Sequence, residues 1–177
     1  ELTYSGSLAE KDTRPVSISA IIGLLGCVMG EGSVNFVNAQ RTLKEMGVKL
    51  LESKTESANG YSNAITLKLT KGGKSTVLQG TVSGKEKRIV QLNEYHTYIP
   101  SEGDMVVAVI EDRPNIIGPC CVVLGEGKIN IAGMHVGRIA EGEPQLMVLS
   151  VDHLASEEIM KKLKGVPGVV SAKMVEL

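Results

Sequence analysis

The sequence has no Trp, a single Phe and only three Cys among its 177 residues. With so few aromatic side chains, the core has to be built from Val, Ile and Leu. Cys120 and Cys121 are adjacent in an apolar segment, so the cysteines have neither the spacing of a zinc site nor the number of a disulfide framework. We therefore expect small buried thiols in a reducing compartment and no metal site.

Long apolar runs and an excess of one charge are also missing. No stretch of about eighteen apolar residues predicts a membrane span, and no basic-then-apolar leader opens the chain. The formal net charge of −1 argues against capture of nucleic acid or an anionic membrane. We expect a cytoplasmic protein that binds neither. Because the chain opens on Glu1 with a strand already under way, we also expect a fragment of a longer protein.

Motifs for catalysis and cofactor binding are scarce. GLLGCVMGEG (residues 23–32) has four glycines, but it lies in an apolar-periodic helix with no strand before it, so neither the dinucleotide nor the P-loop spacing is met. We interpret these glycines as a helix packing contact and a C-cap. His96, His135 and His153 share no short motif with Cys, Asp or Ser. We therefore predict no catalytic residue and no cofactor in this chain.

The apolar patterns predict an α+β protein with two domains. Residues 1–102 read as a small α/β domain and residues 103–177 as a second domain with the order βαββαβ, which is a ferredoxin-like sandwich. In the first domain we expect helices over 16–30 and 37–46, and strands over 2–9, 48–54, 61–70, 74–83 and 87–99, the last folded as a hairpin near residue 93. In the second we expect strands over 105–111, 128–139, 145–152 and 168–177, and helices over 116–127 and 157–165.

The stretch EDRPNIIG (residues 111–118) joins a charged turn to the expected start of a helix. In a βαββαβ unit the first strand ends at the N-terminus of the first helix, where unpaired backbone N–H groups favour a carboxylate. Asp112 lies at that end and can accept from an ammonium group, and Asn130 opens the neighbouring strand. Together they would complement an amino acid. The alternative is that Asp112 and Asn115 cap the helix and Asn130 is a turn residue.

A second cluster of charge lies in SGKEKR (residues 83–88). Lys85, Lys87 and Arg88 precede the strand that carries His96. Cations gathered at a hairpin can hold a phosphate or carboxylate. The alternative is a solvated turn. On the first interpretation, the anion-binding residues are Lys85, Lys87, Arg88 and His96.

Several segments resemble the regulatory part of D-3-phosphoglycerate dehydrogenases. INIAGMHVGR, followed by a short acidic turn and LMVLSVD, is similar to the C-terminal ACT domain of that family. YSGSLAEKDTRP, VNFVNAQ and GTVSGKEKRIVQLNEY are similar to its intervening domain, which is also called the allosteric substrate-binding domain. The resemblance covers essentially the whole chain. It implies the C-terminal regulatory part of an oxidoreductase of L-serine biosynthesis.

The resemblance implies that ACT domains pair across a two-fold axis into one continuous sheet and bind L-serine there as a feedback effector. The chain would then be a homo-oligomer, at least a dimer. Asp112 and Asn130 match family positions that contact the serine, whereas Asn115 stands where the family usually has Gly. The effector-binding residues predicted on this basis are Asp112, Arg113, Pro114, Asn115, Ile116, Asn130 and Ile131.

The resemblance also places NAD and the catalytic residues in the upstream part of the dehydrogenase, so that this chain by itself is not an enzyme. In the intervening domain, Arg88 falls where the family has a basic residue that binds a phosphate-bearing ligand. A second basic partner of the family is replaced by Pro100. Two other interpretations stay open: the regulatory portion of an iron–sulfur L-serine dehydratase, and a free-standing amino-acid sensor.

Overall fold

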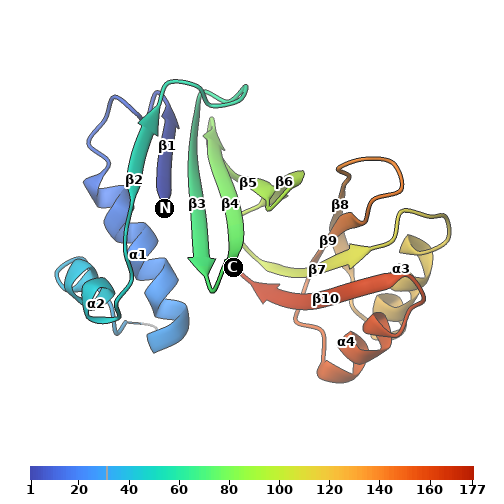
Figure 1. Cartoon of the computed structure of the whole chain (residues 1–177). Helices are drawn as coiled ribbons and strands as arrows, with labels where there is room; N and C mark the ends of the chain where they lie inside the picture. The colour runs from blue at the N-terminus through green and yellow to red at the C-terminus, as the bar shows by residue number, and fades with distance from the viewer. Residues whose placement is uncertain (31) are drawn as a thin grey trace. The chain divides into compact units, whose positions relative to one another are not determined.

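The computed structural model describes residues 1–30 and 32–177, which form two compact units, Glu1–Val82 and Ser83–Leu177 (Figure 1). No helix in the described part of the chain is long and apolar enough to cross a membrane. The second unit contains the residues of both candidate sites.

The first unit is a sheet with helices. Its strands have the order β2-β1-β3-β4, in which β1 and β2 are parallel and the remaining pairs are antiparallel. The elements are β1 (Leu2–Gly6), α1 (Arg14–Met29), α2 (Ala39–Glu45), β2 (Glu52–Thr55), β3 (Asn63–Lys71) and β4 (Lys74–Ser83). Every helix and strand predicted for residues 1–83 is present, with its ends shifted by a few residues.

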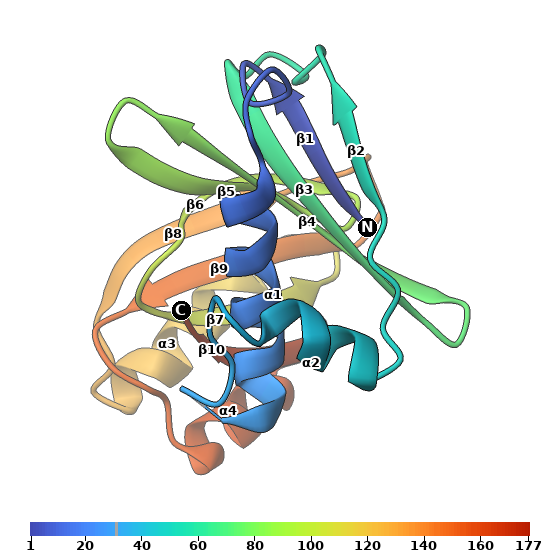
Figure 2. The same ribbon diagram turned by 90° about the vertical axis from the view of Figure 1, so that its left-hand side faces the viewer.

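Helices α1 and α2 share an aliphatic core, and Figure 2 shows them side by side. Ile21 and Leu25 of α1 pack with Leu43 of α2, because residues three or four apart share one helix face. Gly30 is the predicted C-cap of α1; its backbone N–H donates to the carbonyl oxygen of Gly26, and its φ of 92° is one that Gly adopts readily. The predicted glycine packing contact is wrong: within the described residues, no heavy atom lies within 4 Å of a Cβ built at Gly23 or Gly26, beyond their own chain neighbourhood.

The second unit carries an antiparallel sheet with the strand order β10-β7-β9-β8. Its elements follow the order βαββαβ after a hairpin, and the predicted α+β class is confirmed. They are β5 (Glu86–Leu92), β6 (Tyr95–Pro100), β7 (Asp104–Ile110), α3 (Ile117–Glu126), β8 (Ile131–Gly137), β9 (Gln145–Val151), α4 (Glu157–Lys164) and β10 (Val169–Glu176).

Both faces of this second sheet are covered. Val106 and Leu149 face a core that includes Cys120 and Leu124 of α3 and Leu163 of α4. Their neighbours in the strands face the other way, because successive side chains of a strand point to opposite faces. On that opposite face, Met105, Leu146 and Val148 pack with Ile99 of β6 and partly buried residues of β5. The sheet therefore lies between a helical layer and the β5–β6 hairpin.

This packing explains why the second compact unit begins at Ser83. The sequence groups the hairpin with the first domain, which we placed at residues 1–102. In the structure its apolar side chains pack on the second sheet. The domain boundaries expected from the sequence, 1–102 and 103–177, stay a prediction.

The cysteines differ in their surroundings. Cys120 is buried in the helical layer, and burial raises the pKa of its thiol. Cys121 is half-buried and Cys27 is exposed. The expectation of buried thiols is confirmed for Cys120 and wrong for Cys27, which lies on the outer side of α1. Within the described residues, no group of three or more His, Cys, Asp and Glu could hold a metal ion.

Candidate functional site

Asp112 lies just after β7 and is surrounded by hydrogen-bond donors. Its Oδ2 accepts from the backbone N–H of Gly142 at 2.8 Å and from Nε of Arg138 at 2.9 Å. A second guanidinium nitrogen of Arg138 also donates to Oδ2, and the side-chain amide of Gln145 donates to Oδ1. Only 11% of the Asp112 side chain is exposed. Arg138 and Gly142 lie in the connection between β8 and β9, and Gln145 is the first residue of β9.

The sheet topology brings these residues together. β7 and β8 both run antiparallel to β9, the strand between them. The C-terminal ends of β7 and β8 therefore lie at the same end of the sheet, beside the start of β9. Ile110 is paired with Gln145, and Gly137 is paired with Leu146. Asp112 and Arg138 follow their strands by one or two residues and therefore meet beside the start of β9.

The donors stabilise the charged form of the carboxylate. The backbone hydrogen bond from Gly142, followed by those from the Arg138 guanidinium, holds the pKa of the Asp112 carboxyl below its usual range. Partial desolvation opposes this shift. Asp112 is thus a fixed negative charge at neutral pH.

The N-terminus of α3 follows Asp112 in the sequence and, within the described residues, has no side-chain cap. Its N-cap residue, Ile116, is buried and has no polar side-chain atom that could accept a hydrogen bond. The alternative in which Asp112 and Asn115 cap this helix is therefore wrong. Asp112 lies four residues before the N-cap residue of α3, and its carboxylate oxygens accept hydrogen bonds from Arg138 and Gly142 in the β8–β9 connection. The first N–H groups of α3 have no capping side chain in the described structure.

Asn115 has φ 63°, in the left-handed region. Asn is among the residues that tolerate this conformation, and Gly adopts it without a steric cost. Asn115, in place of the Gly that the resemblance leads us to expect, is therefore compatible with this left-handed backbone conformation. The Asn115 side chain is exposed.

The rest of the loop is supported by the turn between α4 and β10. The backbone N–H of Glu111 donates to the carbonyl oxygen of Gly168 at 2.8 Å, and Arg113 donates to the Glu111 carboxylate at 2.7 Å. A Cβ at Gly168 would collide with Ile116 and approach Arg113. Pro114 is exposed at the tip of the loop.

Asn130 and Ile131 lie at the opposite end of the sheet from Asp112. Ile131 is paired with Val151 at the end of β9, and Asn130 donates from its side-chain amide to the Asp152 carboxylate at 2.9 Å. The seven residues of β8 separate them from Asp112 by roughly 20 Å. Within one chain the structure therefore does not bring the two ends of the predicted effector site together.

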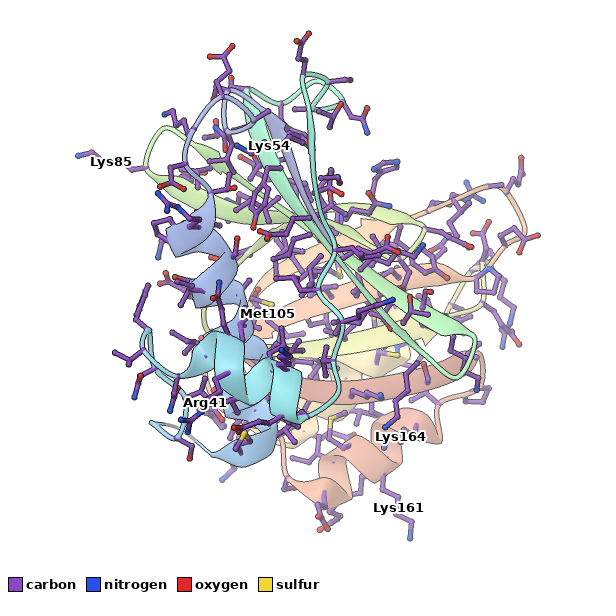
Figure 3. The ribbon with its side chains drawn as sticks, turned by 60° about the vertical axis from the view of Figure 1, so that its left-hand side comes forward. Arg41, Lys54, Lys85, Met105, Lys161 and Lys164 are labelled. Atoms are coloured by element: carbon purple, nitrogen blue, oxygen red, sulfur yellow. The ribbon has the colours of Figure 1, made fainter. Side chains whose placement is uncertain are left out.

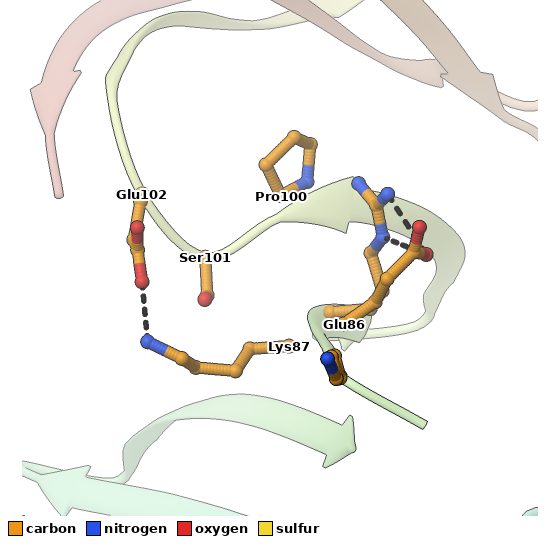
Figure 4. A pocket seen from close by; sticks show the side chains of 7 residues that line it. Glu86, Lys87, Pro100, Ser101 and Glu102 are labelled. Atoms are coloured by element: carbon orange, nitrogen blue, oxygen red, sulfur yellow. Dashed lines mark hydrogen bonds and ion pairs between the residues drawn. The ribbon is translucent and has the colours of Figure 1, made fainter. Parts of the chain in front are cut away.

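The basic cluster lines a shallow pocket of about 220 Å³ at the open end of the β5–β6 hairpin (Figure 4). Arg88 is paired with Pro100 across the hairpin, and its guanidinium lies 5.2 Å from the centre of the Tyr98 ring. The pocket is lined by Lys85, Glu86, Lys87, Arg88, Pro100, Ser101 and Glu102.

The pocket cations have carboxylate partners. Arg88 donates to Glu86 at 3.0 Å, and Lys87 donates to Glu102. Figure 3 shows Lys85 pointing outward from the turn before β5. His96 is paired with Gln91 near the closed end of the hairpin, so the structure does not place it with the other predicted anion-binding residues.

Three residues at Asp112 were missed from the sequence: Arg138, Gly142 and Gln145. The predicted βαββαβ order could have indicated Arg138. In that topology the first and second strands flank the third strand and end on the same side of the sheet. An Arg directly after the second strand then lies beside an Asp directly after the first. Gly142, which contributes a backbone N–H, carries no signal of this kind.

Comparisons with known proteins identify the family. The family of the D-3-phosphoglycerate dehydrogenase intervening domain matches residues 1–93. The chain is 34% identical over 179 residues to the D-3-phosphoglycerate dehydrogenase of Archaeoglobus fulgidus, which covers 100% of the chain and 34% of the relative. It is 33% identical over 177 residues to the D-3-phosphoglycerate dehydrogenase of Methanocaldococcus jannaschii, and this alignment covers 100% of the chain and 33% of the relative. It is 33% identical over 178 residues to the D-3-phosphoglycerate dehydrogenase of Bacillus subtilis, and this alignment covers 99% of the chain and 34% of the relative.

The chain spans about a third of the length of these relatives and corresponds to their C-terminal part. The resemblance seen in the sequence is thereby confirmed. The chain belongs to the D-3-phosphoglycerate dehydrogenase family and contains its intervening domain.

Proposed function

We propose that this chain is the regulatory, non-catalytic portion of a D-3-phosphoglycerate dehydrogenase and that it binds L-serine as a feedback effector. Residues 103–177 would be its ACT domain. The observation that supports the proposal is an N-terminus of α3 without a side-chain cap, in the same loop as a charged carboxylate, Asp112, four residues before the N-cap residue Ile116. An amino acid presents both a carboxylate and an ammonium, and this end of the sheet presents a group for each.

The carboxylate of serine would lie on the first N–H groups of α3. These groups have no side-chain acceptor, and a helix N-terminus favours negative charge. The ammonium of serine would lie toward Asp112, which the low pKa of its carboxyl keeps charged. Asn115 is exposed beside this position, so its side chain can turn toward the ligand or away from it.

Asn130 would join the site from a second copy of the chain. In the described residues β8 is paired with β9 alone, which leaves β8 at an edge of the sheet. If two copies pair antiparallel along β8, the start of one strand lies beside the end of the other. Asn130 of the partner subunit would then lie near Asp112, although Asn130 and Asp112 of the same chain are separated by roughly 20 Å along β8. Serine bound there would favour the paired state.

The oxidoreductase activity and its NAD would belong to the part of the dehydrogenase outside this chain. The glycines of 23–32 do not fit a dinucleotide loop, because Gly23 and Gly26 lie inside α1, and α1 starts eight residues after β1 ends, at Arg14 after Gly6.

Calorimetric titration of the chain with L-serine tests the proposal, with glycine and D-serine as controls. We expect saturable binding of L-serine alone, weakened at least tenfold by Asp112→Ala and by Asn130→Ala. The two variants remove groups at opposite ends of the sheet, so loss in both supports a site shared by two copies. Absence of heat at millimolar L-serine would refute the proposal.

A phosphate-bearing ligand at the basic pocket is a second candidate. Lys85, Lys87 and Arg88 line a concave surface there, and Arg88 lies across from Pro100, the position where the resemblance places a second basic residue. A phosphate would have to replace Glu86 and Glu102 as the partner of these cations. Saturable binding of inorganic phosphate, lost in Arg88→Gln and kept in Arg14→Gln, would support this site. Equal binding by both variants would refute it.

The comparisons favour the dehydrogenase over the other interpretations. The relatives reported above are named D-3-phosphoglycerate dehydrogenases and are about three times as long as the region they share with this chain. A serine dehydratase portion or a free-standing sensor has no such support.

A further inference from the structure

The Asp112 carboxylate is already occupied by a cation of the same chain. We propose that Arg138 and the turn that follows it form an internal competitor for the ammonium subsite, which must leave Asp112 when an amino acid binds. This inference rests on the proposed function, and it adds a residue that sets the affinity of the site.

The hydrogen bonds at Asp112 crowd one of its two oxygens. Each carboxylate oxygen offers two lone pairs. Oδ2 receives two donors from Arg138 and one from Gly142, whereas Oδ1 receives one from Gln145. An incoming ammonium group, which carries three donors of its own, finds one further position on Oδ1 and can pair fully with the carboxylate only when a donor on Oδ2 leaves.

Arg138 is the donor whose place an ammonium can take. It is the one cation among the donors described at Asp112, so replacing it with the ligand cation keeps the carboxylate paired. The Arg138 side chain is 48% exposed, so its charge can return to water without burial. Gln145, in contrast, is held in the start of β9.

The turn is built so that it can move without disturbing the core. Every residue from Arg138 to Pro144 is exposed, whereas Gly137 and Leu146 on either side are buried. No buried side chain therefore anchors this described segment. The hydrogen bonds of Arg138 and Gly142 to Asp112 tie this segment to the β7–α3 loop.

Arg138→Gln tests the competition. The variant removes the internal cation, so we expect it to bind L-serine about threefold to fivefold more tightly than the unchanged chain, the range of one weak ion pair. L-glycerate, which has a hydroxyl group in place of the ammonium, should gain nothing. Unchanged or weaker L-serine binding by Arg138→Gln would overturn the inference.

Lys162→Gln is the matched control. Lys162 is an exposed cation of α4 in the same unit, and it pairs with Glu158. The same positive charge is thus removed without freeing Asp112. A gain for L-serine in Lys162→Gln as large as that in Arg138→Gln would mean that overall charge is responsible and would also overturn the inference.

Hydrogen exchange of the Gly142 amide separates this inference from the proposed function. Without ligand, we expect exchange to be at least tenfold faster in Asp112→Ala than in the unchanged chain, because the amide has lost its acceptor. Saturating L-serine should also speed it in the unchanged chain. If L-serine binds and Gly142 stays equally protected, the competitor is refuted while the proposed function stands. If L-serine gives no heat with any variant, the proposed function fails.

Discussion

At the scale of single residues, the backbone conformation of Asn115 affects the stability of the loop after β7. Its φ of 63° is costly for most side chains by roughly 1–2 kcal/mol and free of that cost for Gly. We predict that Asn115→Ala lowers the free energy of unfolding by about 1 kcal/mol, whereas Asn115→Gly changes it by less than about 0.5 kcal/mol. Urea unfolding followed by circular dichroism measures both. Equal losses in the two variants would contradict the backbone argument.

Asp112 gives a pH dependence whose sign follows from its environment. Its pKa is lowered in the folded chain, first by the Gly142 backbone hydrogen bond and then by Arg138. The stabilisation is present above the ordinary carboxyl pKa of about 3.9 and is lost as the pH falls through the lower folded value. We predict that Asp112→Asn unfolds at a lower temperature than the unchanged chain at pH 7. The difference should shrink toward pH 2. A difference independent of pH would contradict this role.

At the scale of elements, β6 and β8 approach so closely that one position between them requires Gly. A Cβ at Gly137 would lie 2.6 Å from the His96 carbonyl oxygen. At Gly133 of the same strand, the nearest atoms to such a Cβ are those of the Ser150 side chain at 3.8 Å. We predict that Gly137→Ala lowers the free energy of unfolding by about 1–3 kcal/mol and that Gly133→Ala leaves it nearly unchanged. Similar losses in both, measured by urea unfolding, would contradict the close approach.

The elements were also the part of the fold that the sequence predicted best. The helix predicted over 157–165 is present as α4, where Ser156 accepts from the Ile159 N–H and acidic residues open the helix while lysines close it. Figure 3 shows Lys161 and Lys164 projecting outward from this helix. Such local signals depend on neighbours in the sequence, so a single chain reveals them.

Contacts between distant segments were harder to predict. Asp112 was predicted as a site residue from the sequence, but its partner Arg138 lies twenty-six positions along the chain and became visible only through strand order and register. Asn130 was grouped with Asp112 because both flank strands of one sheet. The direction of β8 places them at opposite ends instead. The packing of the β5–β6 hairpin on the second sheet likewise depends on side chains that no local pattern pairs.

At the scale of the whole molecule, the account predicts that association depends on the edge of β8. Met134 is the middle residue of this strand, and its side chain is 55% exposed. In an antiparallel pair centred on it, the two copies of residue 134 would lie opposite each other. Met134→Lys would place like charges there, and like charges directly opposite are destabilising. We predict at least a tenfold weaker dimer with an unchanged far-ultraviolet circular dichroism spectrum. Unaltered association would place the contact elsewhere.

The most direct test of the central claim is sedimentation equilibrium of the chain with and without saturating L-serine. If serine binds between two copies and barely to one, mass action requires it to tighten the dimer. The account predicts a dimer dissociation constant at least tenfold lower with L-serine, no change with D-serine, and no response in Asp112→Ala. A constant that is the same with and without L-serine would contradict a serine site shared by two subunits.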